Sequence, residues 1–226
     1  NGITSLIGEL WARQELSELR KTFGWTEWII HTGATFVFGV TAVLIVPFIK
    51  VYTLGIHDAN YNQPLFAILI VSANVVHCLR LPYNIIILAA GHYKQTQNNY
   101  IIAAALNIAI SILAVKRWGL VGVAIGTLIA MSYQTMWMAW YDSKNIIEWP
   151  LMNFFKQIAI DSITVLICSI VSFLFPMHSV SYLGWIINAI EVSVTWLLIM
   201  VIINSIFYRD KMFRLINIFK TRLTKR

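Results

Sequence analysis

The sequence predicts an all-α fold, a polytopic membrane helix bundle of about six transmembrane helices. Hydrophobic residues make up 58% of the chain and charged residues only 12%. The mean hydropathy of +0.71 lies above the range of ordinary soluble domains. The apolar runs reach the ~20 residues that a membrane span needs, and they do not alternate as barrel strands do. A soluble helical core is disfavoured because these runs are apolar on all sides.

Six apolar runs separated by polar loops are the predicted spans, at residues 27–49, 64–90, 99–115, 119–141, 157–176 and 184–207. Residues 1–23 mix leucines with charges, and we expect the end of a preceding helix and a cytoplasmic interfacial segment there. Because this segment starts abruptly without Met, we expect the chain to be a fragment of a longer protein. The first four spans form one unit at 24–141. A cytoplasmic loop at 142–156, two additional spans at 157–207 and a basic amphipathic cytoplasmic tail at 208–226 follow.

The net charge of +7 has a clear distribution along the chain. If the tail is cytoplasmic and the spans alternate, thirteen of the 17 Lys and Arg residues face the cytoplasm. Only Lys50, Lys116 and Arg117 face outward, and Arg80 falls inside a span. This asymmetry follows the positive-inside rule and predicts a cytoplasmic C-terminus. A nucleic-acid partner is therefore unnecessary to explain the charge, whereas membrane lipids are expected partners.

Acidic and histidine side chains do not form a catalytic or metal-binding pattern in the sequence. Asp161 and Glu191 lie in different spans, and His31 and His77 are isolated, without metal-ligand spacing. We therefore expect no catalytic residues, no metal and no cofactor. Ordinary interpretations are that Asp161 faces the inner headgroups and Glu191 pairs with a neighbour, and a role in ion coupling is the alternative.

Arg80 is different, because it lies deep within the second predicted span. A charged side chain at a span centre costs roughly 2.5–3.5 kcal/mol, and Pro82 should kink the helix beside it. His77, Arg80 and Asn84 are spaced to share one helix face, and Asn74 lies about one turn above them. The pattern predicts a cationic stripe that faces a water-filled substrate pathway. The alternative is a structural ion pair between Arg80 and an acid on another helix.

Three glycines begin the fourth predicted span. Gly119, Gly122 and Gly126 recur at spacings of three and four, and we expect them to share a face that packs closely against a neighbouring helix. A phosphate-binding loop is disfavoured, because the glycines lie in a membrane segment and match no such motif.

Several short motifs, in this order and spacing, resemble the C-terminal half of bacterial polysaccharide flippases. That family comprises the O-antigen and capsule repeat-unit transporters of the multidrug/oligosaccharidyl-lipid/polysaccharide exporter superfamily. The similarity covers about residues 1–150, and beyond 150 only hydropathy matches. The motifs are Pro47-Phe48, Tyr52-Thr53, Asp58, Tyr61, Arg80-Leu81-Pro82-Tyr83-Asn84, the run from Ala90 to Thr96, Asn107, Ser111 and the run from Gly119 to Ala130.

The resemblance implies a two-lobed transporter without enzymatic activity in the bacterial cytoplasmic membrane. This chain would supply most of one lobe and a peripheral pair of helices, and its partner would be the missing N-terminal half. The implied substrate is a polyprenyl-diphosphate-linked oligosaccharide, and the polysaccharide polymerase machinery is a further expected partner. Arg80 would face the central cavity and offset the charge of the diphosphate. Lys94 would meet that group at the cytoplasmic entrance, although an ordinary loop lysine is equally expected there.

Two departures from the family pattern remove charge. Many relatives carry an acid just before the asparagine equivalent to Asn107, where this chain has Ala103, Ala104 and Ala105. Where relatives often have Tyr-Arg-Thr, this chain has Gln134 in the middle position. No ion-coupling or substrate role is therefore carried over to these two places.

Two other classes of function are weighed against the flippase. A drug or cation exporter of the same superfamily should show acidic polarity inside the lobe, whereas here the polarity centres on Arg80. A membrane enzyme such as a polymerase or acyltransferase needs a long catalytic loop or a His/Asp constellation. The longest expected loops, 50–63 and 142–156, contain neither.

Overall fold

The computed structural model describes residues 2–177 and 179–224, and every regular element in these ranges is a helix. Residues 1, 225 and 226, which belong to the expected first segment and tail, lie outside the described residues. Six helical segments of the described chain are long and apolar enough to cross a membrane, with α3 and α4 together forming one of them. The predicted fold class is thus confirmed, and the chain is a multi-pass membrane protein. The helices are α1 (Gly2–Ala12), α2 (Leu16–Tyr52), α3 (Pro64–Leu79), α4 (Leu81–Ala89), α5 (Tyr93–Trp118), α6 (Leu120–Asn145), α7 (Leu151–Ser172), α8 (Tyr182–Phe207) and α9 (Arg209–Thr224).

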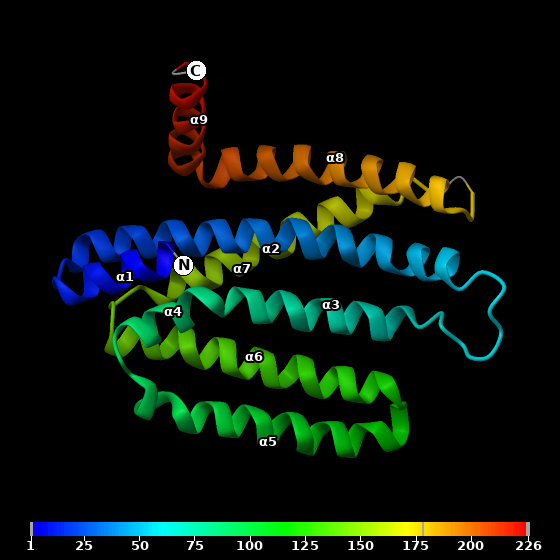
Figure 1. Cartoon of the computed structure of the whole chain (residues 1–226), viewed down its shortest axis with the longest axis horizontal. Helices are drawn as coiled ribbons and strands as arrows, with labels where there is room; N and C mark the ends of the chain where they lie inside the picture. Colours follow the sequence, from blue (N-terminus) through cyan, green and yellow to red (C-terminus); the bar gives the residue numbers. More distant parts are fainter. Residues whose placement is uncertain (1, 178, 225–226) are drawn as a thin grey trace.

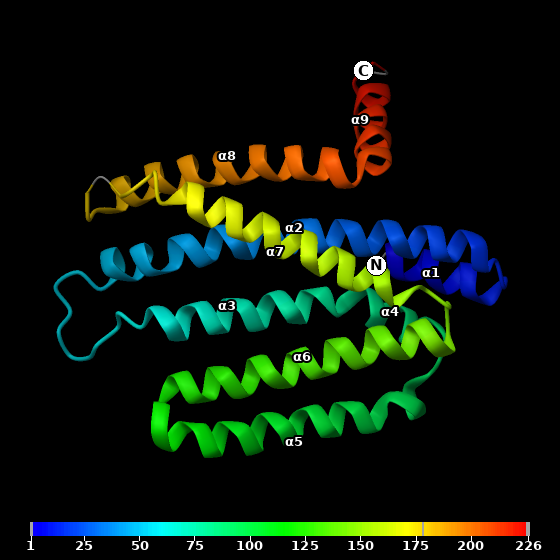
Figure 2. The ribbon, with the colours of Figure 1, turned by 180° about the vertical axis from the view of Figure 1, so that it is seen from behind.

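The spans form a flat row in the order α8, α2, α3, α6, α5 (Figure 1). Helix α7 crosses α2 obliquely and also contacts α8, as the view from behind shows (Figure 2). Helix α9 turns away from α8 across the direction of the spans. The two additional C-terminal spans therefore pack mainly on α2, and α7 also contacts α6.

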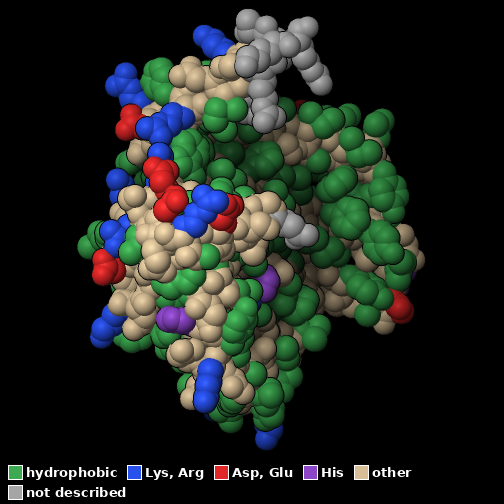
Figure 3. Space-filling view, turned by 60° about the vertical axis from the view of Figure 1, so that its left-hand side comes forward, with side chains coloured by type: hydrophobic (Ala, Val, Ile, Leu, Met, Phe, Trp, Pro, Cys, Tyr) green, Lys and Arg blue, Asp and Glu red, His purple; other side chains and the backbone are tan. Residues whose placement is uncertain are grey.

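The start of α2 and the end of α8 lie at one end of the row, together with the start of α5 (Figure 1). We call this the basic end. Figure 3 looks toward it and shows Lys and Arg side chains along one side, with hydrophobic side chains covering the flank. Helices α2 and α5 finish at the opposite end, where Lys50, Lys116 and Arg117 are found. This arrangement fits the charge asymmetry predicted from the sequence.

Two boundaries differ from those expected. Helix α2 already begins at Leu16, so residues 16–23 are its first turns and form no separate interfacial segment. Leu19 and Phe23 are fully buried against α1, which runs antiparallel beside α2, and this burial stabilises the helix beyond the apolar run (Figures 1 and 2). The expected loop 142–156 shrinks to residues 146–150, because α6 and α7 extend into it and Ile147 and Phe154 join the same core.

The glycine prediction is correct for two of the three positions. A Cβ on Gly122 would lie 2.4 Å from the Ala114 backbone, and one on Gly126 would lie 2.3 Å from Ser111 Oγ. These two glycines therefore allow the close approach of α5 and α6. The prediction is wrong for Gly119, which has a φ of +55° in the turn between α5 and α6 and no neighbour within 4 Å of a built Cβ. Its role is to supply the left-handed backbone that joins the two helices.

Candidate functional site

The predicted break in the second span is present at Arg80. Helix α3 ends at Leu79 and α4 begins at Leu81, so Arg80 is the junction residue. Pro82 is buried in the first turn of α4, where its ring removes the amide hydrogen that would continue the α3 hydrogen-bond ladder. The expected interruption at Pro82 is confirmed.

The guanidinium of Arg80 has a histidine rather than an acid as its neighbour. Its Nη2 lies 2.8 Å from His77 Nδ1, one turn back along α3. An arginine side chain only donates hydrogen bonds, so Nδ1 accepts and His77 is neutral in this contact. Within the described part of the chain, Arg80 forms no ion pair with Asp or Glu. The alternative of a structural ion pair is therefore wrong for these residues.

The stripe continues from Arg80 toward the basic end. Tyr100 of α5 donates a hydrogen bond of 2.7 Å from its hydroxyl to Asn84 Oδ1 on α4. Tyr100 and Lys94 both line a groove of about 620 Å³ along α4 and α5, whose lining also includes Gln97. We call His77, Arg80, Asn84, Tyr100 and Lys94 the cationic stripe.

The structure differs from the predicted set of substrate-pathway residues at two positions, Tyr100 and Asn74. Tyr100 was missed by the sequence analysis, because its contact joins two helices across a turn. Asn74 is exposed and bonds only the carbonyl of Ile70 on its own helix, at 2.8 Å. Asn74 therefore remains a substrate-pathway prediction that no contact with Arg80 supports.

Arg80 lies nearer the basic end than its position in the sequence suggested. Tyr83, three residues later, donates a hydrogen bond to Glu27 on α2, and Glu27 also accepts one of 3.1 Å from Trp149 in the loop after α6. Helix α3, with 16 residues, is about 24 Å long and ends directly before Arg80. The expectation of a cation at the centre of its span is therefore corrected to one nearer the basic end of the span, where burying a charge costs less.

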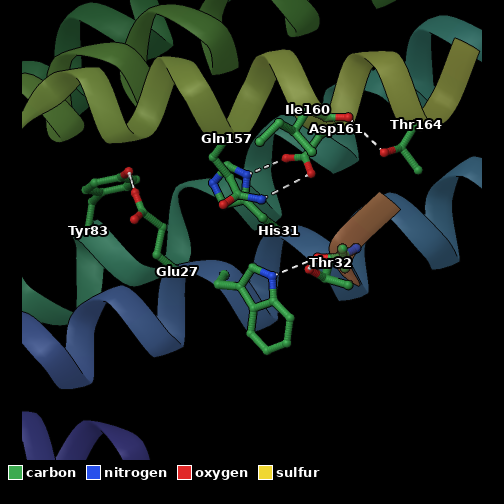
Figure 4. Close-up of polar contacts among 10 residues, drawn as sticks. Glu27, His31, Thr32, Tyr83, Gln157, Ile160, Asp161 and Thr164 are labelled. Carbon is green, nitrogen blue, oxygen red and sulfur yellow. Dashed lines mark hydrogen bonds and ion pairs between the residues drawn. The ribbon is translucent and has the colours of Figure 1, made fainter. Parts of the chain in front are cut away.

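A second group of polar side chains is buried between α2, α4 and α7 (Figure 4). Asp161 Oδ2 lies 2.6 Å from His31 Nδ1, and Asp161 Oδ1 accepts a hydrogen bond of 3.4 Å from Gln157. Glu27 and Tyr83 form the adjoining pair of the same group. We call Glu27, His31, Tyr83, Gln157 and Asp161 the buried polar cluster.

The cluster overturns the interpretation of His31 as isolated and of Asp161 as a residue facing headgroups. His31 is fully buried, and its Nε2 has no hydrogen-bond partner in the described chain. Asp161 also borders a cavity of about 510 Å³ between α2, α3 and α7, whose lining is mostly apolar but includes Thr35 and Ser72. A carboxylate with a histidine partner beside a cavity can bind a proton or a small cation.

The described residues contain no group of three or more His, Cys, Asp or Glu that could hold a metal ion. The side chains of the two groups offer hydrogen bonding, charge neutralisation and the binding of a proton or a small cation. No family model, curated protein or solved structure matches the chain.

Proposed function

We propose that this chain is part of a transporter that moves polyprenyl-diphosphate-linked oligosaccharide repeat units across the bacterial cytoplasmic membrane. The repeat units would serve O-antigen, capsule or exopolysaccharide synthesis. In this proposal the basic end and the C-terminus face the cytoplasm, and a second lobe completes the transport pathway.

The observation that carries the proposal is the half-buried Arg80, whose neighbour is a neutral histidine and which has no acidic partner among the described residues. A carboxylate partner would satisfy the guanidinium and leave no charge for a ligand. Without one, its planar donor fork is available to a phosphate, which it can bind through two parallel hydrogen bonds.

The remainder of the cationic stripe suits the other parts of the same ligand. Asn84 and Tyr100 offer an amide and a hydroxyl, which can exchange hydrogen bonds with sugar hydroxyls. Lys94 adds a second cation in the groove along α4 and α5. The groove lies on the exposed side of α5, where Tyr93 and Ile101 also have large exposed surfaces, so a polyprenyl chain could stay in lipid while its headgroup binds.

One observation favours the runner-up, a multidrug or cation exporter. Glu27 and Asp161 give the bundle interior the acidic polarity that is expected of a drug or cation exporter. In a cation exporter, Asp161 would bind the substrate or its counter-ion in the adjoining cavity.

The test uses the full-length protein in bacteria that lack their own flippase. Arg80→Ala should abolish surface polysaccharide and cause lipid-linked repeat units to accumulate inside, whereas Arg80→Lys should keep part of the export because it retains the charge. Arg117→Ala, an exposed cation at the opposite end, is the matched control and should export normally.

Membrane levels of all variants are matched before export is compared. Normal export by Arg80→Ala would refute the proposal. Drug or cation resistance that depends on Asp161 but is unchanged by Arg80→Ala would favour the exporter instead.

A further inference from the structure

The first turns of α9 pack back onto α2, far from the cationic stripe in sequence. Lys211 donates a hydrogen bond of 2.7 Å to the carbonyl of Gly24, and its ammonium lies 5.8 Å from the ring centroid of Trp28. A Cβ on Gly24 would lie 2.8 Å from the ring of Trp149, so this glycine allows the loop before α7 to approach α2. Helix α2, the loop before α7 and α9 therefore meet at one point.

A pocket of about 290 Å³ opens at this meeting point, and we call it the basic pocket. Its charged lining comprises four cations and one acid. Trp25 and Trp149 provide aromatic walls. The charged residues are Arg20, Lys21, Lys211, Arg214 and Asp210.

The cations of the basic pocket are incompletely neutralised. Arg20 is engaged by the Ile147 carbonyl at 2.7 Å and by Glu148 at 2.6 Å. Lys21 pairs with Glu18 at 3.2 Å, but both side chains are exposed and such a pair contributes little. Arg214 forms no ion pair within the described chain.

The lowered pKa of Lys211 also indicates that the positive charge of the basic pocket is incompletely neutralised. Burial, together with the nearby charge of Lys156, lowers the pKa of Lys211 from 10.5 to about 8, although the carboxylate of Glu27 acts in the opposite direction. An anion in the pocket would offset both effects, because it would stabilise the charged ammonium.

The residues around the pocket are of the kind found beside lipid headgroups. Trp25, Trp28 and Tyr208 cluster around the root of α9, as aromatic residues do at membrane interfaces. Helix α9 crosses the direction of the spans and exposes Phe213 and Ile216, which suits a helix lying in the plane of the interface (Figures 1 and 2).

From this geometry we propose that the basic pocket binds the phosphate of an anionic membrane lipid. Arg214, and Lys21 on release from its exposed pair with Glu18, would turn toward the phosphate, and the tryptophan rings would contact the glycerol region. The volume suits a small headgroup rather than an oligosaccharide, since drug-sized ligands occupy pockets of about 300–1,000 Å³. This site is separate from the groove of α4 and α5, so it does not depend on the proposed transport substrate.

The test measures lipid binding to the full-length protein in detergent, with short-chain phosphatidylglycerol and phosphatidylcholine as probes. The double variant Lys21→Gln/Arg214→Gln removes two cations of the pocket. The control Arg209→Gln/Lys220→Gln removes two cations of α9 that do not line it. Each cation near a headgroup is worth about fivefold in affinity, so the pocket variant should bind phosphatidylglycerol about thirtyfold more weakly. The control should stay within about twofold of the unmodified protein.

Three results would overturn the proposal. Equal affinity for the two lipids would show that no anionic headgroup is recognised. Equal losses in the two double variants would show a general charge effect without a site. Displacement of phosphatidylglycerol by inorganic phosphate at millimolar concentration would assign the pocket to a free anion. Thermal unfolding of each variant is measured alongside, so that a loss of binding by a folded protein is distinguished from misfolding.

Discussion

Substitution of Gly39 by Ala provides a sharp test of how the additional spans are attached. Gly39 lies on α2, where a Cβ would sit 1.9 Å from Cζ3 of Trp196 on α8. This distance is about half of an ordinary carbon–carbon contact of 3.5–4.0 Å. The ring or the helix must therefore move.

The ring has little room to move. Trp196 is fully buried, and its indole Nε1 donates a hydrogen bond of 2.9 Å to Ser172 Oγ on α7. Overpacking costs about 1–3 kcal/mol, and losing this hydrogen bond adds about 1 kcal/mol. We therefore expect Gly39→Ala to lower the free energy of unfolding by about 2–4 kcal/mol.

The assay is thermal unfolding of the detergent-purified protein, followed by fluorescence-detected size exclusion. Gly33→Ala is the matched control, because Gly33 lies on the same helix and a Cβ there meets nothing within 4 Å. This control should be neutral or slightly stabilising, since Ala favours helix over Gly by up to about 1 kcal/mol. If Gly39→Ala unfolds at the same temperature as the unmodified protein, the packing of α8 on α2 described above is incorrect.

Three further predictions use the same unfolding assay. Asp161→Ala should cost about 1–3 kcal/mol, because His31 would be buried without any partner, whereas Asp161→Asn keeps an acceptor and should cost less; equal losses would contradict the hydrogen bond between them. Gly126→Ala should cost about 1–3 kcal/mol, because the new methyl group would lie 2.3 Å from Ser111 Oγ, and an unchanged melting temperature would exclude this close approach. The lowered pKa of Lys211, about 8 in the folded protein against 10.5 ordinarily, means that the unfolded chain binds more protons between these values, so stability should rise with pH across that window. Lys211→Met should abolish that rise, and a rise of equal size in this variant would assign it to another group.

The number and order of the spans could be predicted because hydropathy reports directly on burial in lipid. The helix ends could not, since they depend on protein contacts outside the bilayer. Leu19 and Phe23 extend α2 because α1 covers them, and Phe154 extends the start of α7 because it packs on Tyr83 of α4. Such contacts between different helices cannot be predicted from the local pattern of charged residues.

The candidate site was predictable only where its residues share a helix. The spacing of His77 and Arg80 predicted that they share a helix face, and in the structure Arg80 Nη2 lies 2.8 Å from His77 Nδ1. The contact of His31 with Asp161 joins residues that are 130 positions apart, and no local spacing reports it. One signal was present, because each is the fifth residue of a predicted span that starts on the same side of the membrane. Matching the depths of polar residues across spans would have placed the two at the same level.

The central proposal is tested most directly by translocation in reconstituted vesicles. Full-length protein would be placed in vesicles with a fluorescent polyprenyl-diphosphate-linked oligosaccharide, and the fraction that becomes inaccessible to an external quencher would be followed over time. We expect translocation by the unmodified protein and by Arg117→Ala, and a loss of at least about tenfold in rate for Arg80→Ala, since a charge-assisted contact to phosphate contributes about 1.5–3 kcal/mol. Equal translocation rates for the unmodified protein and Arg80→Ala would contradict the proposal. So would a translocation rate for the unmodified protein no higher than that of protein-free vesicles.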